Sequence, residues 1–337
     1  MLIDMRLKEL TYIEPGFSIE GLYFNYVNLI VGKNAVGKSR AVAIIKKFYQ
    51  LITHKYDIRE NDFFEYNVLF VDGDVDIRYR FVCQGGEVFL EYLDDSYSHY
   101  LDRQAGITHL YGENICPPKN KLCVNVRRDA QKYPEIEKIV RWAEQSYAFY
   151  FGTSELVCNE ADCTLVSMFE KLGKTQHKKV IDMMKSMGYD IEDIRVGEAG
   201  TRHRYLLISE KDVLEIMRME DLSQAMQKTL YIAVLMNYLT TKSVDSRTMI
   251  IDGLCEGIDC ERSVLMGRYI YEFCIKNDIQ LIATTNDTFL MNVVNLNYWN
   301  ILKRMGGRVE ALNMHNSLSL FSEFKSKNIE NYHLLYD

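Results

Sequence analysis

A glycine-rich loop is the segment of this chain that is best equipped for chemistry. It matches the pattern G-x-x-x-x-G-K-[ST] with the residues Gly32, Lys33, Asn34, Ala35, Val36, Gly37, Lys38 and Ser39. Glycines let the backbone curl until its N–H groups point at phosphate oxygens. Lys38 can reach the β- and γ-phosphates, and the Ser39 hydroxyl suits magnesium, which prefers hard oxygen ligands. The loop therefore predicts a site for ATP with Mg²⁺.

Polar residues at the ends of two apolar segments supply the other half of the predicted site. Asp252 ends the segment RTMIID, and Asn286 ends QLIATTN. In ATPases with such a loop, an aspartate at this position holds magnesium, so Ser39 and Asp252 are the predicted metal ligands. Asn286 is placed to orient the attacking water. The alternatives are that Asp252 caps the following turn and that Asn286 caps the following helix.

Two basic side chains at the loop, Lys33 and Arg40, are further candidate contacts to the nucleotide. For each of them the alternative is a solvated side chain. The loop itself is flanked as the chemistry requires. Strands are expected at 5–13 and 21–31, the second running directly into the loop, and a helix at 39–52 follows, where apolar residues recur at helical spacing.

The rest of the chain reads as alternating strands and helices. Strong alternation over 65–95 predicts an antiparallel meander of three strands, 96–130 is expected to be irregular, and 134–150 is expected to be a helix. Further on, the pattern predicts a helical pair at 164–189, a strand at 203–209, an apolar helix capped by Asp221 or Ser223, and a strand–helix–strand unit over 247–286. The tail, 307–337, carries weaker signals.

Composition narrows the class of protein. The chain has 337 residues, of which 47% are hydrophobic, and a formal net charge of −7, so global charge gives no argument for nucleic-acid binding. None of the eight cysteines forms a CxxC pair, and no signal peptide is recognisable, so we expect reduced thiols in the cytoplasm. No apolar run reaches the roughly 20 residues of a membrane span, and we expect no contact with a membrane.

Four segments together resemble the ABC-type ATPase heads of the SMC and RecF group. Closer still, they look like the compact bacterial AAA-type ATPases of the OLD and PtuA kind, which are associated with phage defence. The segments are GKNAVGKS (32–39), DLSQAMQK (221–228), IIDGLCEGID (250–259) and LIATTND (281–287). The resemblance implies an α/β P-loop fold in which two heads associate face to face around two ATP molecules. Ser223 would then contact, in trans, the γ-phosphate held by the other head, and 257–259 would form a loop that faces the dimer.

Two positions depart from that pattern. Related heads read Leu-Ser-x-Gly where this chain has Ala225, and most relatives place an acidic residue directly after the aspartate, where this chain has Gly253. Glu256, three residues further on, is the remaining candidate for the base that activates water. Losing a well-placed base costs about 10²–10⁴ in rate. We therefore hypothesise that ATP binding and head association are retained while hydrolysis is slow.

The expected organisation is an ATPase core over 1–55 and 205–337, interrupted by an inserted lobe over 56–204. The lobe would hold the meander and a helical part, 134–189, that presents the segment 221–228, called the signature segment. The preferred function is an ATP-driven switch that acts on a separate effector protein, in phage defence by resemblance. A non-hydrolysing ATP-gated scaffold and a RecF-like DNA-repair ATPase are the alternatives. One basic cluster (Lys119, Lys121, Arg127, Arg128) could contact nucleic acid or form a solvated face.

Overall fold

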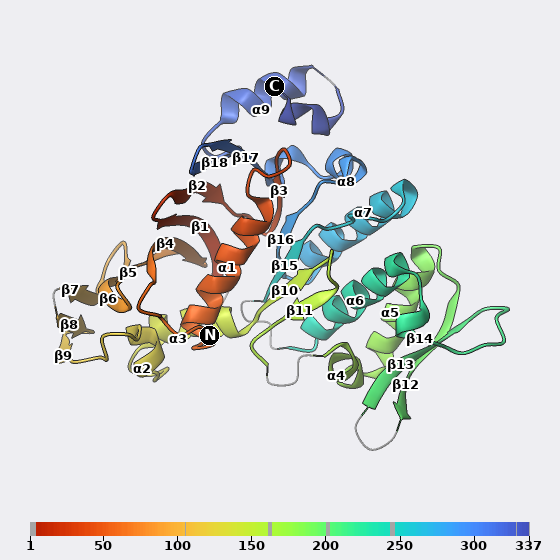
Figure 1. Cartoon of the computed structure of the whole chain (residues 1–337), viewed down its shortest axis with the longest axis horizontal. Coiled ribbons are helices and arrows are strands. Elements are labelled where there is room, and N and C mark those ends of the chain that lie inside the picture. Colours follow the sequence, from red (N-terminus) through yellow and green to blue (C-terminus); the bar gives the residue numbers. More distant parts are fainter. Residues whose placement is uncertain are drawn as a thin grey trace.

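The structure, a computed structural model, describes residues 5–104, 106–160, 164–199, 203–242, 247–327 and 329–336. The described residues form an α/β fold around one large mixed sheet (Figure 1). The strand order in this sheet is β11-β10-β15-β16-β3-β17-β18-β2-β1-β4-β5-β6-β7-β8-β9. The bounds are β1 Met5–Glu14, β2 Phe17–Tyr23, β3 Val27–Val31, β4 Phe63–Asp72, β5 Val75–Gln84, β6 Glu87–Asp95, β7 His99–Gln104, β8 Ile107–Leu110, β9 Glu113–Ile115, β10 Ser146–Tyr150, β11 Glu155–Val157, β15 Thr248–Asp252, β16 Gln280–Thr284, β17 Trp299–Met305 and β18 Arg308–Leu312.

The middle of this sheet is parallel. Strands β10, β15, β16, β3 and β17 run in the same direction. Parallel strands are covered on both faces and therefore read as continuous apolar runs, as VNLIV in β3 and QLIAT in β16 do, where every residue is buried. The predicted strands at the glycine-rich loop, at Asp252 and before Asn286 are thus confirmed as neighbours in one sheet.

Helices cover both faces of the parallel strands. Their bounds are α1 Lys38–Ile52, α2 Cys123–Val126, α3 Pro134–Glu144, α4 Leu165–Glu170, α5 Lys174–Ser186, α6 Gln224–Leu239, α7 Cys260–Lys276, α8 Thr288–Val293 and α9 Leu318–Ser326, with 3₁₀ turns η1 Met219–Asp221, η2 Leu296–Tyr298 and η3 Asn331–Leu335. In Figure 1, α1 lies on one side of β3, β16 and β15, and α6 and α7 lie on the other. Two hydrophobic cores result, one on each face of the sheet.

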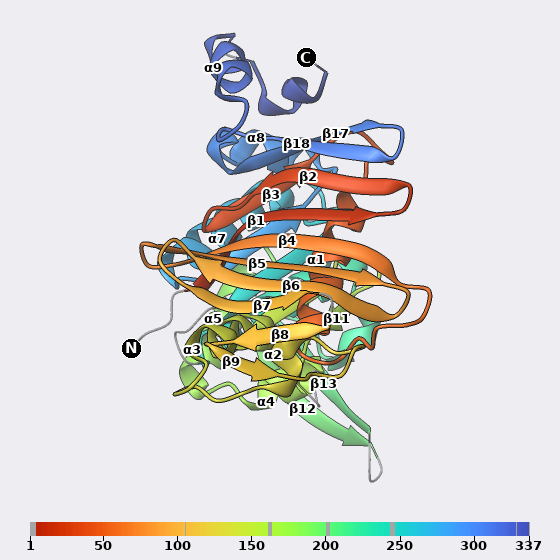
Figure 2. The ribbon, with the colours of Figure 1, turned by 90° about the vertical axis from the view of Figure 1, so that its left-hand side faces the viewer.

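The antiparallel half of the sheet is longer than the sequence predicts. The meander continues past β6 through β7, β8 and β9, so the expectation that 96–130 is irregular is wrong for 99–115. Figure 2 shows these strands side by side across one face of the molecule. The turn at Tyr111 and Gly112, both with positive φ, reverses the chain between two strands of only three and four residues, and such short strands give little periodic signal.

The strand expected at 21–31 is in fact two strands. Asn25 donates its N–H to the side chain of Asn28 (2.7 Å), and Phe24 donates to the carbonyl of Lys8 (2.8 Å). This side-chain turn replaces the ladder locally, so β2 ends at Tyr23 and β3 begins at Val27.

The helix expected over 134–150 ends at Glu144, and β10 follows at once. The residues Ser146–Tyr150 pair in parallel with Thr248–Asp252 of β15, so this aromatic run lies inside the sheet. The Ser146 hydroxyl donates to the carbonyl of Trp142 (2.8 Å) and helps to end α3. Tertiary pairing has overridden the local helical pattern. Helix α3 packs against α1, whereas α4 and α5 pack against α6, so only the latter two accompany the signature helix.

A second, three-stranded sheet stands beside α4 and α5. It consists of β12 Ile191–Ala199, β13 His203–Glu210 and β14 Met217–Arg218, in that order. The sequence predicts only β13. In Figure 1 this sheet lies at the lower right, on the side away from the meander. The strand β14 leads through η1 directly into the signature helix α6.

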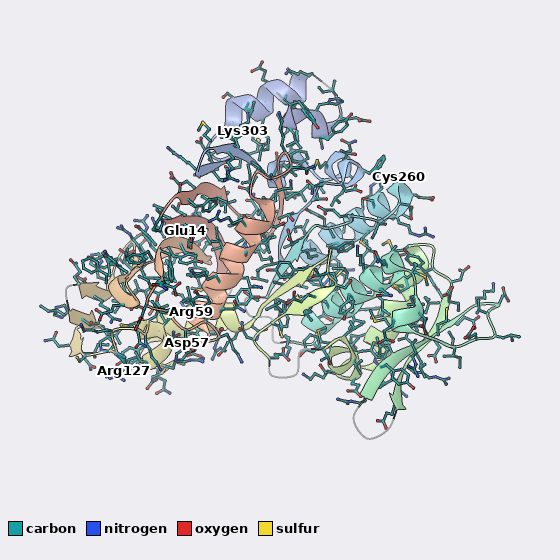
Figure 3. The ribbon with its side chains drawn as sticks, viewed as in Figure 1. Glu14, Asp57, Arg59, Arg127, Cys260 and Lys303 are labelled. Carbon is teal, nitrogen blue, oxygen red and sulfur yellow. The ribbon has the colours of Figure 1, made fainter. Side chains whose placement is uncertain are left out.

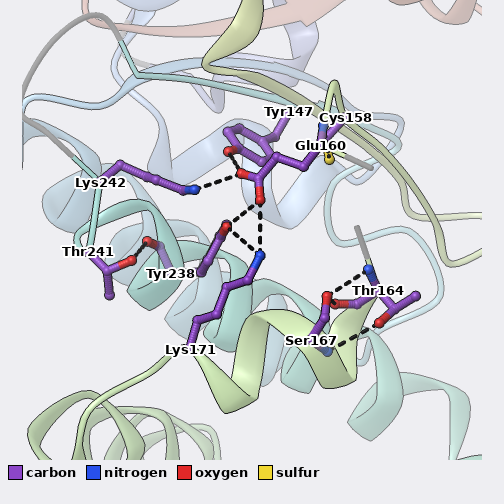
Figure 4. A network of polar contacts seen from close by, with 9 residues as sticks. All are labelled: Tyr147, Cys158, Glu160, Thr164, Ser167, Lys171, Tyr238, Thr241 and Lys242. Carbon is purple, nitrogen blue, oxygen red and sulfur yellow. Dashed lines mark hydrogen bonds and ion pairs between the residues drawn. The ribbon is translucent and has the colours of Figure 1, made fainter. Parts of the chain in front are cut away.

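A polar network fixes the segment after β11 against α4 and α6 (Figure 4). The carboxylate of Glu160 accepts hydrogen bonds from Tyr147 and from Tyr238 (2.6 Å), and it pairs with Lys171 (3.3 Å) and Lys242 (2.8 Å). Burial alone would raise its pKa, but these donors lower the pKa to about 2. The carboxylate is therefore ionised at neutral pH, and it joins the segment after β11 to β10, to α6 and to the end of α4.

The cysteines differ from the expectation at one position. Cys83, Cys116, Cys123, Cys255, Cys260 and Cys274 are free thiols, but Cys158 is disulfide-bonded, so the expectation of eight reduced thiols is wrong there. Cys163 lies outside the described residues. Within the described ranges, every helix is too short or too polar to cross a bilayer.

Candidate functional site

The glycine-rich loop connects β3 to α1 and opens the N-terminus of that helix. Gly37 caps α1 without any side-chain hydrogen bond, and the first bond of the helix runs from the N–H of Ala41 to the carbonyl of Gly37 (2.9 Å). The N–H groups of Lys38, Ser39 and Arg40 therefore have no acceptor inside the helix. Together with the helix dipole, such free N–H groups form a site for an anion.

The backbone of the loop needs small residues. A Cβ on Gly32 would lie 2.8 Å from Val36 Cγ1 and 2.9 Å from the carbonyl oxygen of Leu302, so only glycine fits. Ala35 takes a left-handed φ of 62°, which costs roughly 1–2 kcal/mol for a residue with a side chain. The loop thus has the curved backbone expected from the glycine pattern, and Ala35 as well as the glycines adopts a positive φ. Asn34, Ala35 and Ser39 are exposed to solvent.

Lys38 is buried at the centre of the site. Its ammonium donates to the carbonyls of Gly32 (2.8 Å) and Lys33 (3.2 Å) and so ties the two ends of the loop together. Burial lowers the pKa of Lys38, while the charges of Glu256 and Asp252 act in the opposite direction. Both carboxylates therefore lie within electrostatic reach of the ammonium, as a site for a polyphosphate and a cation requires.

Asp252 is held by the neighbouring strand. The Thr284 hydroxyl donates to Asp252 Oδ1 (2.6 Å) and accepts from the N–H of Gly253 (2.8 Å). The Asp252 carboxylate is thus oriented at the edge of the sheet by β16 and makes no cap for the turn that follows. Thr284 is fully buried, and its orienting role is apparent only once β15 and β16 are known to be neighbours.

Asn286 does not cap α8. The N-cap is Asp287, whose carboxylate accepts from the N–H of Leu290 (2.7 Å). Asn286 instead donates twice to Glu256 Oε1, from its backbone N–H (2.9 Å) and from its side-chain amide (3.0 Å). The structure therefore brings the two candidate catalytic residues into direct contact.

Lys33 and Arg40, the two basic candidates for nucleotide contact, have partners within the chain. Arg40 pairs with Glu14, which Figure 3 labels beside the β1–β2 turn, and its guanidinium lies 3.4 Å from the centroid of the Phe17 ring. The ammonium of Lys33 lies 5.3 Å from the centroid of the Tyr336 ring. Each of the two side chains therefore already has a contact within the chain.

A cavity of about 670 Å³ lies beside the glycine-rich loop. It is lined by residues 32–36, by 301–306 of the β17–β18 hairpin, and by Glu310, Leu335 and Tyr336.

The Ser39 hydroxyl and the Asp252 carboxylate fit magnesium by the chemistry of their donors. Both offer hard oxygen atoms, which Mg²⁺ prefers. Thr284 occupies only Oδ1 of Asp252, and the Ser39 side chain is exposed. These two residues would hold the ion, which would neutralise charge on the phosphates of a bound nucleotide.

The signature segment begins α6. Ser223 caps the helix, with its hydroxyl accepting from the N–H of Met226 (3.3 Å), which decides between the two expected caps. Ser223 is exposed, and apolar residues on the nearby loop are exposed as well, with Val213 at 46% and Leu214 fully. One turn into the helix, the buried Lys228 donates from Nζ to the backbone carbonyl of Glu256 (3.2 Å). The sequence pattern gives no sign of this last contact.

Two of the four residues in the basic cluster that could bind nucleic acid, Lys119 and Arg128, form ion pairs within the chain. Arg128 pairs with Glu137 (2.8 Å) and Glu144 (2.7 Å), and Lys119 pairs with Glu87 (3.2 Å). In Figure 3, Arg127 lies at the lower left, far from Lys303 beside the glycine-rich loop. These ion pairs favour the solvated-face interpretation for Lys119 and Arg128.

The described fold is similar to solved SMC head domains. The SMC head domain from Thermotoga maritima superposes with a TM-score of 0.51 at 12% identity, covering 91% of this chain and 98% of that one. An SMC head bound to the C-terminal winged-helix domain of ScpA gives 0.54 at 11% identity, with 93% and 99% covered. An SMC head with an extended coiled coil, bound to the C-terminal domain of ScpA from Pyrococcus furiosus, gives 0.54 at 10% identity, with 95% and 100% covered.

Comparison of sequences adds nothing to this likeness. No family model matches the chain, and no curated protein matches it either. At this level of identity the superposition speaks for architecture alone. The chain thus has a fold similar to that of solved SMC head domains, and no sequence match assigns it to a family.

Proposed function

We propose that this chain is an ATP-binding head that associates face to face with a second head when Mg-ATP is bound. The observation that carries the proposal is the position of Lys38, buried between the carbonyls of its own loop and within electrostatic reach of Asp252 and Glu256. On binding, the triphosphate would replace those carbonyls as the partner of the ammonium. The uncapped start of α1 would supply N–H donors to the same phosphates.

The association is supported by the exposed Ser223 and by the resemblance of the four motif segments to heads that associate in pairs. A second head would offer Ser223 to the γ-phosphate held here. The exposed Val213 and Leu214 lie on the loop that leads to the same segment, so ATP-dependent association would bury them. Exposed apolar groups of this kind commonly mark interaction surfaces.

The proposed output is a change in a separate partner protein. Two of the solved heads are bound to a domain of ScpA, which is support by analogy for a head that reports its nucleotide state to another chain. A role in antiviral defence rests on the resemblance of the four motif segments and on nothing further. It would be tested by phage plating on cells that carry the gene with its neighbours, with Lys38→Ala as the inactive version.

The test of the core proposal combines binding and size. Titration of the purified chain with Mg-ATP should show saturable binding, and light scattering should show the mass doubling when ATP is present. Lys38→Ala should abolish both effects. Binding without any change in mass would leave an ATP-binding protein but refute the association, and absence of binding would refute the whole proposal.

The alternative of a non-hydrolysing scaffold draws on a specific observation, the glycine at position 253. It predicts ATP-dependent association with no release of phosphate above the Lys38→Ala background. A turnover above about 1 s⁻¹ at saturating ATP would exclude it. A RecF-like role predicts ATP-dependent and salt-sensitive DNA binding, which the paired charges of the basic cluster do not favour.

A further inference from the structure

The turn after β15 brings the carboxylate of Glu256 close to Gly253, three residues earlier in the chain. Gly253 has a φ of 76°, and the N–H of Glu256 donates to the Gly253 carbonyl (3.0 Å). A Cβ built on Gly253 would lie 3.2 Å from both Cδ and Oε2 of Glu256 and 3.5 Å from Oε1. The carboxylate of residue 256 thus lies in tight contact with the position that a side chain at 253 would take, and it would have to shift to admit one.

Two groups fix the orientation of that carboxylate. Both donors of Asn286 point at Oε1, at 2.9 and 3.0 Å. Among the residues that the structure describes, Oε2 accepts no hydrogen bond. The charge of Glu256 also acts on the buried ammonium of Lys38. One oxygen is therefore anchored while the other remains available to accept a proton.

We infer that Glu256 is the general base for ATP hydrolysis and that the missing side chain at Gly253 makes room for it. The inference rests on the function proposed above. The water oxygen forms a bond to Pγ, and the bond from Pγ to the oxygen that bridges the β- and γ-phosphates breaks, with its electron pair leaving on ADP. The proton of the water passes to Glu256 Oε2 and from there to the inorganic phosphate. Asn286, which donates to the opposite oxygen, is a positioning residue.

The backbone of Glu256 is tied to the signature helix. Lys228 in α6 donates to the Glu256 carbonyl at 3.2 Å, and its ammonium lies 3.6 Å from the Cβ position of Gly257 and 4.9 Å from the centroid of the Phe151 ring. Lys228 is buried, and a buried ammonium without a hydrogen-bond acceptor would cost free energy. We therefore expect its contact with the Glu256 carbonyl to persist. Lys228 is therefore a second positioning residue, and it links the segment that begins with Ser223 to the base. Contact of Ser223 with the other head would bear on α6 and, through Lys228, on the base.

The first experiment changes only the proton acceptor. Glu256→Gln keeps the shape and the Asn286 contacts, so ATP affinity should stay within about twofold while phosphate release at saturating ATP falls about 10²–10⁴-fold. Glu261→Gln, on the exposed first turn of α7, is the matched control and should change neither quantity. Release by Glu256→Gln within threefold of the parent chain would overturn the inference.

Failure of the inference can be told apart from failure of the proposed function. If the parent chain binds Mg-ATP but releases no phosphate above the Lys38→Ala background, the ATP-binding head stands and the base assignment falls. If the parent chain does not bind ATP, the proposed function falls first. The two readouts, binding and release, are measured on the same preparation.

The second experiment tests the link through Lys228. Lys228→Met should lower phosphate release at saturating ATP at least tenfold without weakening ATP binding, and Lys228→Arg, which can still donate to the Glu256 carbonyl, should recover most of the loss. A purely structural role would lower affinity, melting temperature and release together. That outcome, or the absence of rescue by arginine, would overturn the positioning role.

Discussion

The hydroxyl of Thr284 lies 2.6 Å from Oδ1 of Asp252 and joins the ends of two adjacent parallel strands. The Thr284 hydroxyl oxygen also accepts a hydrogen bond from the N–H of Gly253 at 2.8 Å. One buried hydroxyl therefore orients both the Asp252 carboxylate and the first residue of the turn 253–256. The carboxyl ends of parallel strands meet at one edge of a sheet, and here that edge carries the predicted metal ligand and the turn that positions Glu256.

Replacement of Thr284 by valine should therefore weaken the magnesium-dependent part of nucleotide binding. The variant leaves the N–H of Gly253 without its acceptor, which costs about 1–3 kcal/mol of stability, and it frees the Asp252 carboxylate to rotate. We expect ATP affinity to fall about tenfold in magnesium and little in EDTA. Thr288→Val, at an exposed position, is the control, and equal losses in both buffers would contradict the prediction.

Gly253→Ala should damage catalysis more than binding. The added Cβ sits in a left-handed conformation and 3.2 Å from the Glu256 carboxylate, so the base must move. We expect phosphate release to fall at least about tenfold with ATP affinity retained, on the scale of a misplaced base. Gly257→Ala has a similar φ of 80° but makes only an ordinary 3.6 Å contact, and should retain more activity. Equal effects from both variants would show that backbone strain alone is responsible.

Gly32→Ala should disrupt the loop itself. The new methyl group would press on the Leu302 carbonyl at 2.9 Å, a backbone atom that cannot swing away, so the loop must open at a cost of about 1–3 kcal/mol. Gly73→Ala, in a turn with positive φ and no atom within 4 Å of the added group, reports strain alone. A thermal melt of each variant, with and without Mg-ATP, checks this. The prediction fails if Gly32→Ala melts and binds like Gly73→Ala.

Ser223 should separate helix capping from contact with a second head. Ser223→Ala removes the cap of α6 and should cost about 1 kcal/mol of stability, whereas Ser223→Asn keeps a capping oxygen and should preserve it. If Ser223 contacts the γ-phosphate in trans, both variants should bind ATP as monomers and fail to double in mass. An asparagine variant that still associates normally would show that Ser223 acts only as a cap.

The network around Glu160 predicts a stability that depends on pH. The pKa of Glu160 is depressed to about 2 because hydrogen bonds from Lys242, Tyr147 and Tyr238 outweigh burial. Since the folded pKa lies below the unfolded one, the stabilisation is present above about pH 4.5 and is lost as pH falls toward 2. Glu160→Gln should melt a few degrees lower than the parent chain at pH 7, and the two should converge as the pH approaches 2. A constant difference across that range would contradict the prediction.

The sequence predicts the parallel part of the fold and the phosphate loop well, for a physical reason. Strands β3, β15 and β16 are buried on both faces and therefore read as short apolar runs, and the loop motif is set by local backbone geometry. The strand β10 is missed because Tyr147 and Phe149 follow a helix without a visible break. It becomes a strand only because Thr248–Asp252 offers it a ladder.

The candidate site was harder to predict wherever a contact depends on the course of a turn. The side chain of Glu256 lies close to Gly253 because that glycine has a left-handed φ. A single sequence does not predict this φ. The contact of Lys228 with the Glu256 carbonyl joins residues far apart in the chain and follows from no spacing rule. The hypothesis of slow hydrolysis depends on the glycine at position 253, where related heads have an acidic residue. The structure places Glu256 Oε2 3.2 Å from the Cβ position of that glycine.

The continuous hydrogen-bonded ladder from β11 to β9 has a mechanical consequence. Strands that are hydrogen-bonded in one sheet move together, so we expect the meander and the strands beside the glycine-rich loop to move as one unit. The strands β12, β13 and β14 belong to a separate sheet. Fluorescent labels on two strands of the large sheet should therefore keep a fixed separation through a cycle of nucleotide addition. A pair of labels with one on each sheet would report any movement of the three-stranded sheet relative to the large sheet when nucleotide binds.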